Sequence, residues 1–146
     1  MSLPSVRLQL QEQSARLEFD DGRIVALPVG PINLASSVLR HDPPTPVELE
    51  RAIDFVENAL AESRLSGIDR DLVVSDALLS VLPGLDAAGS VLARSEVEAL
   101  FQKLASRSLG MPVSAGELPH GREVAAALLI LRECMHHLAF DSVIAA

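Results

Sequence analysis

The sequence predicts a single α/β domain over residues 1–146, built on a mixed five-stranded sheet. Three observations predict this fold class. The first third of the chain alternates apolar and polar residues, which is typical of strands with one buried face. The rest carries apolar residues at the spacing of amphipathic helices, interrupted by two short apolar runs typical of buried strands. A length of 146 residues is sufficient for one domain with its own core.

Three strands are expected first, and they are "VRLQL" (6–10), "ARLEF" (15–19) and "RIVALPV" (23–29). The turn "QEQS" (11–14) joins the first two strands. Asp21-Gly22, a strong two-residue hairpin signal, joins the second and third. Because both connections are short, the three strands are predicted to form an antiparallel meander.

A helix is predicted to begin within "RHDPPTPVELERAIDFVENALAES" (40–63). Pro46 suits the first helical position, with Thr45 as the N-cap and Glu48 completing a capping box. Gly67 lies just past the expected end of this helix. The helix start also explains the proline-rich run at residues 43–46, which could otherwise be a ligand for another protein domain.

The second half of the chain alternates helices with two more strands. The run "DLVV" (71–74) is a predicted parallel strand, and Ser75 or Asp76 caps a brief helix that Pro83-Gly84 stops. A helix capped by Ser95 is then predicted in "ARSEVEALFQKLASRS", followed by the loop "GMPVSAGELPHG". A long and mostly apolar helix, expected to be central, follows in "REVAAALLILRECMHHLAF", and "DSVIAA" is a closing strand. The order βββαβααβ predicts a ribonuclease H-like arrangement with helices on both faces of the sheet.

The charge and composition exclude several kinds of partner. The net charge is −8, and the 12 basic residues are spread almost evenly along the chain. Nucleic acid and anionic membranes are therefore not expected partners. The single cysteine, Cys134, excludes an internal disulfide and favours a reducing compartment. With no leader and no apolar run long enough to span a bilayer, we expect a cytoplasmic protein.

Three segments of the chain resemble the exopolyphosphatase and guanosine pentaphosphate phosphohydrolase (Ppx/GppA) family. "ALPVGPINLASSVLRHDPPTPVELERAIDFVENAL" is similar to the family's strand "SLPLGAVRLTE", its "DPPT" segment and the helix after it. "LARSEVEALFQKLASRSL" and "LPHGREVAAALLILRECMHHLAFDSVIAA" are similar to two later segments of the family, in the same order. Family members have two ribonuclease H-like lobes of the actin-like ATPase superfamily, with phosphate bound between them. The resemblance implies that this chain corresponds to the second lobe alone.

The resemblance also implies that the phosphate-binding loops of this lobe are degenerate. The family's first loop is "DIGGGS", in which glycines let backbone N–H groups approach phosphate and the Asp helps to hold a metal. Aligned on Ser14, this chain has Gln9 at the Asp position and Leu10 at the Ile position, and its three replacements for the glycines are Gln11, Glu12 and Gln13. These side chains would fill the phosphate space, and Glu12 would repel the anion.

Two further family signatures are also absent. Ser75-Asp76-Ala77 stands where the family has "GGT", and the chain stops at Ala146 before the closing "GLREG". Only Ser14 matches a signature residue. We therefore expect no catalytic residue, no cofactor-binding residue, no metal-binding residue and no cofactor.

Metal binding and nucleophilic catalysis were considered from the remaining reactive residues. Cys134 and His137 share a helix face, but His136 points away, and further ligands would have to come from His41 and His120 in distant loops. The alternative is a buried thiol beside histidines that suit a helix C-terminus. A Cys134–His pair within one helical turn has poor geometry for nucleophilic attack. None of the candidate nucleophilic serines, Ser14, Ser75 and Ser114, lies in a nucleophile elbow.

A ribonuclease H-like nuclease needs carboxylates on the first strand and its neighbours to hold two metal ions. The first strand carries Gln9 instead. Asp20 and Asp21 are typical of a hairpin turn, and Asp69 and Asp71 precede the fourth strand, at the opposite end from such a site. A nuclease is therefore not expected.

The main prediction is a non-catalytic relative of exopolyphosphatases that acts through protein–protein contact, as a homodimer or with another protein. The surface that the absent lobe would cover, and the edges formed by the third and last strands, support this prediction. The alternative is a subunit of a split polyphosphate or guanosine-phosphate phosphatase whose first lobe is another chain. A third possibility is that the chain is a fragment of a longer protein.

Overall fold

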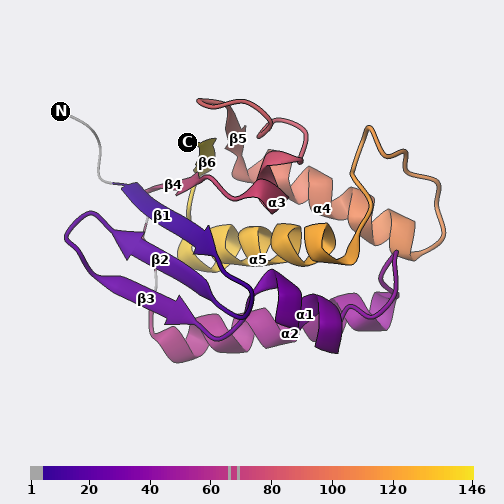
Figure 1. Cartoon of the computed structure of the whole chain (residues 1–146), viewed down its shortest axis with the longest axis horizontal. Coiled ribbons are helices and arrows are strands. Elements are labelled where there is room, and N and C mark those ends of the chain that lie inside the picture. Colours follow the sequence, from indigo (N-terminus) through magenta and orange to yellow (C-terminus); the bar gives the residue numbers. More distant parts are fainter. Residues whose placement is uncertain (1–4, 66, 69) are drawn as a thin grey trace.

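The computed structural model describes residues 5–65, 67–68 and 70–146, and it contains a six-stranded sheet of order β3-β2-β1-β4-β6-β5 (Figure 1). The strands are β1 (Ser5–Leu10), β2 (Ala15–Phe19), β3 (Ile24–Leu27), β4 (Asp71–Val74), β5 (Val91–Ala93) and β6 (Ser142–Ala145). The helices are α1 (Pro31–Ser37), α2 (Pro46–Ser63), α3 (Ala77–Ser80), α4 (Arg94–Ser108) and α5 (Arg122–Leu138). In the described residues no helix is long and apolar enough to cross a membrane.

The strand pairing confirms the predicted meander and the two predicted parallel strands. β1 pairs antiparallel with β2, and β2 pairs antiparallel with β3. β4 and β6 extend the sheet from β1 in parallel. Gly22 turns the chain between β2 and β3 with a φ of +92°, a conformation that favours glycine, as expected for the Asp21-Gly22 pair.

The start of α2 also confirms the sequence prediction. The Oγ1 atom of Thr45 accepts a hydrogen bond from the Glu48 backbone N–H at 3.2 Å, and a Glu48 carboxylate oxygen accepts from the Thr45 N–H at 2.9 Å. Glu48 also accepts from the Arg40 N–H and lies 2.8 Å from Nδ1 of His41. The capping box therefore anchors the proline-containing loop as well as the helix.

Two short elements were not predicted. α1 follows Gly30, and the three-residue strand β5 pairs with β6. The strand β5 ends at Ala93 and α4 begins at Arg94. The Glu96 carboxylate accepts a hydrogen bond from the Ala93 N–H, so Ala93, and not Ser95, is the N-cap. The prediction that the last strand forms an edge is wrong, since β6 lies between β4 and β5. The three residues of β5 are too few to show the period-two alternation that predicts a strand.

The helices pack on one face of the sheet, which corrects the expectation of helices on both faces. The inward residues of the central strands, such as Leu8 and Leu72, are buried, whereas Arg7 is exposed and Val73 is half-buried on the other side. The crossovers from β3 to β4 and from β4 to β6 advance in the same direction across the sheet. Right-handed crossovers that advance in one direction place their helices on one face.

Helix α5 is the centre of the core, as its apolar composition predicted. Every residue from 125 to 131 is buried, because α1, α2, α3 and α4 all pack against α5. In Figure 1, α5 runs through the middle of the molecule, with α2 on one side and α4 on the other. This packing holds the β1–β2 turn, α1 and α3 in place at the carboxyl end of the parallel strands.

Candidate functional site

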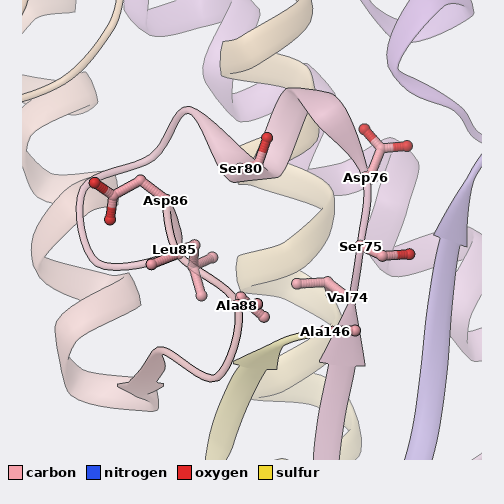
Figure 2. Close-up of a pocket in the computed structure, with 10 residues that line it drawn as sticks. Val74, Ser75, Asp76, Ser80, Leu85, Asp86, Ala88 and Ala146 are labelled. Atoms are coloured by element: carbon pink, nitrogen blue, oxygen red, sulfur yellow. The ribbon is translucent and has the colours of Figure 1, made fainter.

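Two hollows lie where the parallel strands β1 and β4 end. The larger has a volume of about 410 Å³ and is lined by Leu8, Gln9, Leu10, Gln11, Ser75, Asp76 and Ala77. The smaller, of about 90 Å³, lies between β4, α3, the segment 85–88 and the end of β6 (Figure 2). Ser75 and Asp76 line both hollows. The segments 9–14 and 75–77, which stand where the resemblance implies phosphate-binding loops, therefore meet at the carboxyl ends of β1 and β4.

The β1–β2 turn closes on itself through its own hydrogen bonds. The Gln11 backbone N–H donates to the Ser14 carbonyl at 2.8 Å, and the Ser14 hydroxyl donates to the Gln11 side-chain carbonyl at 2.9 Å. The side chains of Gln11, Glu12 and Gln13 are exposed. The backbone N–H of Gln11 and the hydroxyl of Ser14 could each contact an anion, but both are hydrogen-bonded within the turn.

The same turn occupies the N-terminus of α1. The carbonyl oxygen of Glu12 accepts hydrogen bonds from the backbone N–H groups of Ile32 at 3.1 Å and Asn33 at 3.2 Å. Helix N-terminal amides commonly bind anions when no protein group takes them. Here a backbone carbonyl takes two of them, so α1 does not offer these two to a phosphate.

Gly30 permits this contact between the turn and α1. A Cβ atom on Gly30 would lie 2.4 Å from the Gln11 carbonyl oxygen and 2.5 Å from the Ser14 nitrogen. The Asn33 side chain accepts from the Gly30 N–H at 2.8 Å and completes the start of the helix. Sequence reasoning missed α1 as a third part of this site. The available signal was Gly30-Pro31, a pair that suits a helix start with Pro at the first position.

The segment after β4 is closed in a similar way. Asp76 is the N-cap of α3, and its Oδ1 atom accepts from the Leu78 backbone N–H at 2.8 Å. Asp76 thus caps this brief helix, as the sequence predicted. Figure 2 shows Asp76 and Asp86 on opposite sides of the smaller hollow, with their carboxylates pointing apart.

The charges at this edge disfavour an anion. Asp76 lines both hollows and Asp86 lines the smaller one. Among the described residues, no lysine, arginine or histidine lines either hollow. The exposed Glu12 adds a third carboxylate to the adjoining turn. A polyphosphate entering here would meet carboxylates without a compensating cation.

The cysteine and histidine residues do not converge on a metal position. Cys134 is completely buried, whereas His136 and His137 are exposed on the same helix, and His41 bonds to Glu48. Burial, with a smaller effect from the charge of Glu133, raises the pKa of the Cys134 thiol to about 12. Within residues 5–65, 67–68 and 70–146 no three metal-ligating side chains gather.

Of the other candidate residues named from the sequence, Ser75 lines both hollows, and Ser14 lines neither but bonds to Gln11, which lines the larger one. Asp21 binds Arg23 in the β2–β3 turn, and Asp20 pairs with Arg70 at 3.3 Å. Asp71 begins β4, at the end opposite the hollows, and Asp69 lies outside the described residues. Ser114 belongs to the loop between α4 and α5.

Comparison with known proteins identifies the fold. No protein-family model matches the chain, and no curated protein is significantly similar in sequence. Among solved structures, the Aquifex aeolicus PPX-GPPA enzyme has a TM-score of 0.76 at 19% identity, over 100% of this chain and 54% of that one. The chain has the fold of one lobe of the Ppx/GppA proteins.

Two further Ppx/GppA-type structures support the same assignment. An exopolyphosphatase-like protein has a TM-score of 0.71 at 14% identity, over 100% of this chain and 56% of that one. An exopolyphosphatase from Cytophaga hutchinsonii has a TM-score of 0.67 at 11% identity, over 98% of this chain and 53% of that one. The chain thus spans about half the length of these proteins. The predicted ribonuclease H-like α/β fold and its Ppx/GppA resemblance are confirmed at the level of structure.

Proposed function

We propose that this protein is a non-catalytic relative of exopolyphosphatases that acts by protein–protein contact. One observation carries the proposal: the Glu12 carbonyl occupies the N-terminal amides of Ile32 and Asn33 at the edge where the hollows lie. Two backbone N–H groups at the start of α1 that an anion could otherwise contact are therefore already bonded within the protein.

The charges support the same proposal. Phosphoryl transfer requires cations or metal ions that neutralise the developing charge. The two hollows contain carboxylates and no basic side chain among the described residues. The carboxylates of Asp76 and Asp86 point apart, so they do not form a shared metal site either.

Isothermal titration with tripolyphosphate and Mg²⁺ tests the proposal. We expect no saturable binding heat, and no release of inorganic phosphate from long-chain polyphosphate. The variant Asp76→Asn removes one carboxylate and keeps a side-chain oxygen for the cap, so it controls for simple repulsion. Tight, saturable binding of tripolyphosphate by the unaltered protein, or phosphate release that depends on its concentration, contradicts the proposal.

A second candidate function is a subunit of a split phosphatase. The open hollow of about 410 Å³ and the coverage of half a Ppx/GppA chain favour it. The probe is the remaining half of the Aquifex aeolicus protein, mixed in equal amounts with this chain. Polyphosphate hydrolysis by the mixture, and by neither part alone, would support this candidate over the first.

A further inference from the structure

One face of the sheet is left uncovered by the described helices. Residues paired in the sheet share a face, so the pairing of Ile24 with Glu18, Glu18 with Arg7, and Arg7 with Val73 places one row across four strands. Ile144 and Val91 continue this row on β6 and β5. We call the side of the sheet that carries this row the outer face.

The outer face combines apolar residues on β3, β4, β6 and β5 with charged residues on β1 and β2. Ile24 is 53% exposed at one edge and Val91 is 53% exposed at the other, with half-buried Val73 and Ile144 between. Parallel strands such as β4 and β6 are normally covered on both faces, whereas antiparallel strands can leave one face in water. The described helices lie on the opposite face, so the cover has to come from elsewhere.

The charged strand residues of the outer face balance one another. Within the strands its charged residues are Arg7, Arg16, Glu18 and Asp71, two of each sign. The whole chain has a net charge of −8, so the remaining surface carries all of that excess. Contact between copies through the outer face therefore does not bring together two surfaces with a net charge of the same sign.

The row across β3, β2, β1 and β4 is complementary to the same row of a second copy. From the edge inward it is apolar, acidic, basic and apolar, formed by Ile24, Glu18, Arg7 and Val73. A two-fold axis parallel to the strands, between β1 and β2, would set each Arg7 opposite the partner copy's Glu18. It would also set each Ile24 opposite the other copy's Val73. Among the described residues Arg7 makes no ion pair within its own chain, whereas Glu18 pairs with Arg16 at 3.4 Å, so Glu18 would bridge Arg16 and the partner copy's Arg7.

We infer that a second copy of this chain covers the part of the outer face formed by β3, β2, β1 and β4, with the two sheets stacked through these strands. Packed sheets lie about 10 Å apart, which allows the apolar side chains of the two rows to interdigitate. This inference rests on the proposed role in protein contact, and it specifies the surface and the partner.

Sedimentation velocity from low to high micromolar concentration tests the inference, with circular dichroism to check that each variant is folded. We expect the unaltered protein to form a dimer whose share rises with concentration. Ile24→Asp places a charge at the proposed contact and should give a monomer. Val91→Asp is the matched control, because Val91 has the same exposure but lies outside the overlapping strands, and it should remain dimeric.

A charge exchange separates face contact from pairing between sheet edges. Arg7→Glu should weaken the dimer at least tenfold, and Arg7→Glu combined with Glu18→Arg should restore it. A monomeric unaltered protein at high micromolar concentration overturns the inference. So does a dimer that Val91→Asp disrupts and Ile24→Asp leaves intact. The phosphate titration is independent of these measurements, so either proposal can fail alone.

Discussion

The carbonyl oxygen of Glu12 lies 3.1 Å from the amide nitrogen of Ile32, so a hairpin turn serves as the cap of a helix that is distant in sequence. This contact satisfies a backbone N–H at the start of the helix by an internal hydrogen bond. It depends on the close approach of the turn to Gly30, which leads to the first prediction.

Gly30→Ala should destabilise the protein by about 1–3 kcal/mol, because the added Cβ would overlap three backbone atoms that cannot move independently. Gly30 has a φ of −128°, which alanine adopts easily, so the effect is steric. Urea unfolding measures it. Gly116→Ala is the control, since its Cβ would meet only one side-chain atom, at 3.9 Å. Equal stabilities of the two variants would show that the turn does not pack closely on α1.

Glu48→Ala should cost about 1–2 kcal/mol, because it removes the acceptor for the Thr45 and Arg40 amides at the start of α2. Glu50→Ala, an exposed change two residues later, should have little effect in the same unfolding experiment. A loss of equal size at both positions would mean that helix propensity, and not the capping box, is responsible.

The contribution of Glu48 should also depend on pH. Burial acts to raise the pKa of this carboxyl, but hydrogen bonds from the Thr45 N–H and from His41 outweigh it, and the net pKa is lowered. The folded protein therefore holds the carboxylate charged to a lower pH than the unfolded chain. The difference in stability between the unaltered protein and Glu48→Ala should be full at neutral pH and shrink as the pH falls below the ordinary glutamate pKa of 4.5.

Glu133 should make the protein less stable as the pH rises toward neutrality. It is 1% exposed, and burial raises the pKa of its carboxyl to about 7, while Arg132 beside it acts to lower the pKa and Glu57 on α2 to raise it. The folded state thus binds a proton that the unfolded state releases at lower pH. The stabilisation is complete below the ordinary pKa and is lost as the pH rises through 7.

Thermal unfolding at pH values from 5 to 8.5 measures this effect. The melting temperature of the unaltered protein should decline over the range and level off above pH 8. Glu133→Gln keeps the size of the side chain and removes its titration, so its profile should be flatter. Parallel profiles for the two proteins would assign the pH dependence to other groups.

Cys134 should be unreactive in the native protein, because the thiolate is the reactive form and burial keeps the thiol protonated. An aromatic disulfide reagent should label it only at the rate at which the protein unfolds. Ser36→Cys, at an exposed position of α1, provides a second thiol that should react at once. Labelling of Cys134 as fast as that control would show that α5 is not packed as described.

The sequence by itself determined the elements whose signals are local. Alternation and the Asp21-Gly22 pair specify the meander, and Thr45 and Glu48 specify the start of α2. The sequence narrowed the cap of α3 to Ser75 or Asp76, and the structure has Asp76. These features depend on neighbours within a few residues, which sequence spacing reports directly.

Only the tertiary structure decided which elements are in contact and where the sheet ends. The strand β5 and the helix α1 are too short to carry a periodic signal, and β5 moves the edge of the sheet away from β6. The direction of the two crossovers decides that all helices share one face, leaving the outer face open. The contact of Glu12 with Ile32 joins the β1–β2 turn to the start of α1, and the packing of α1 on α5 helps to hold it in place. Such contacts depend on the whole chain path, which no local pattern records.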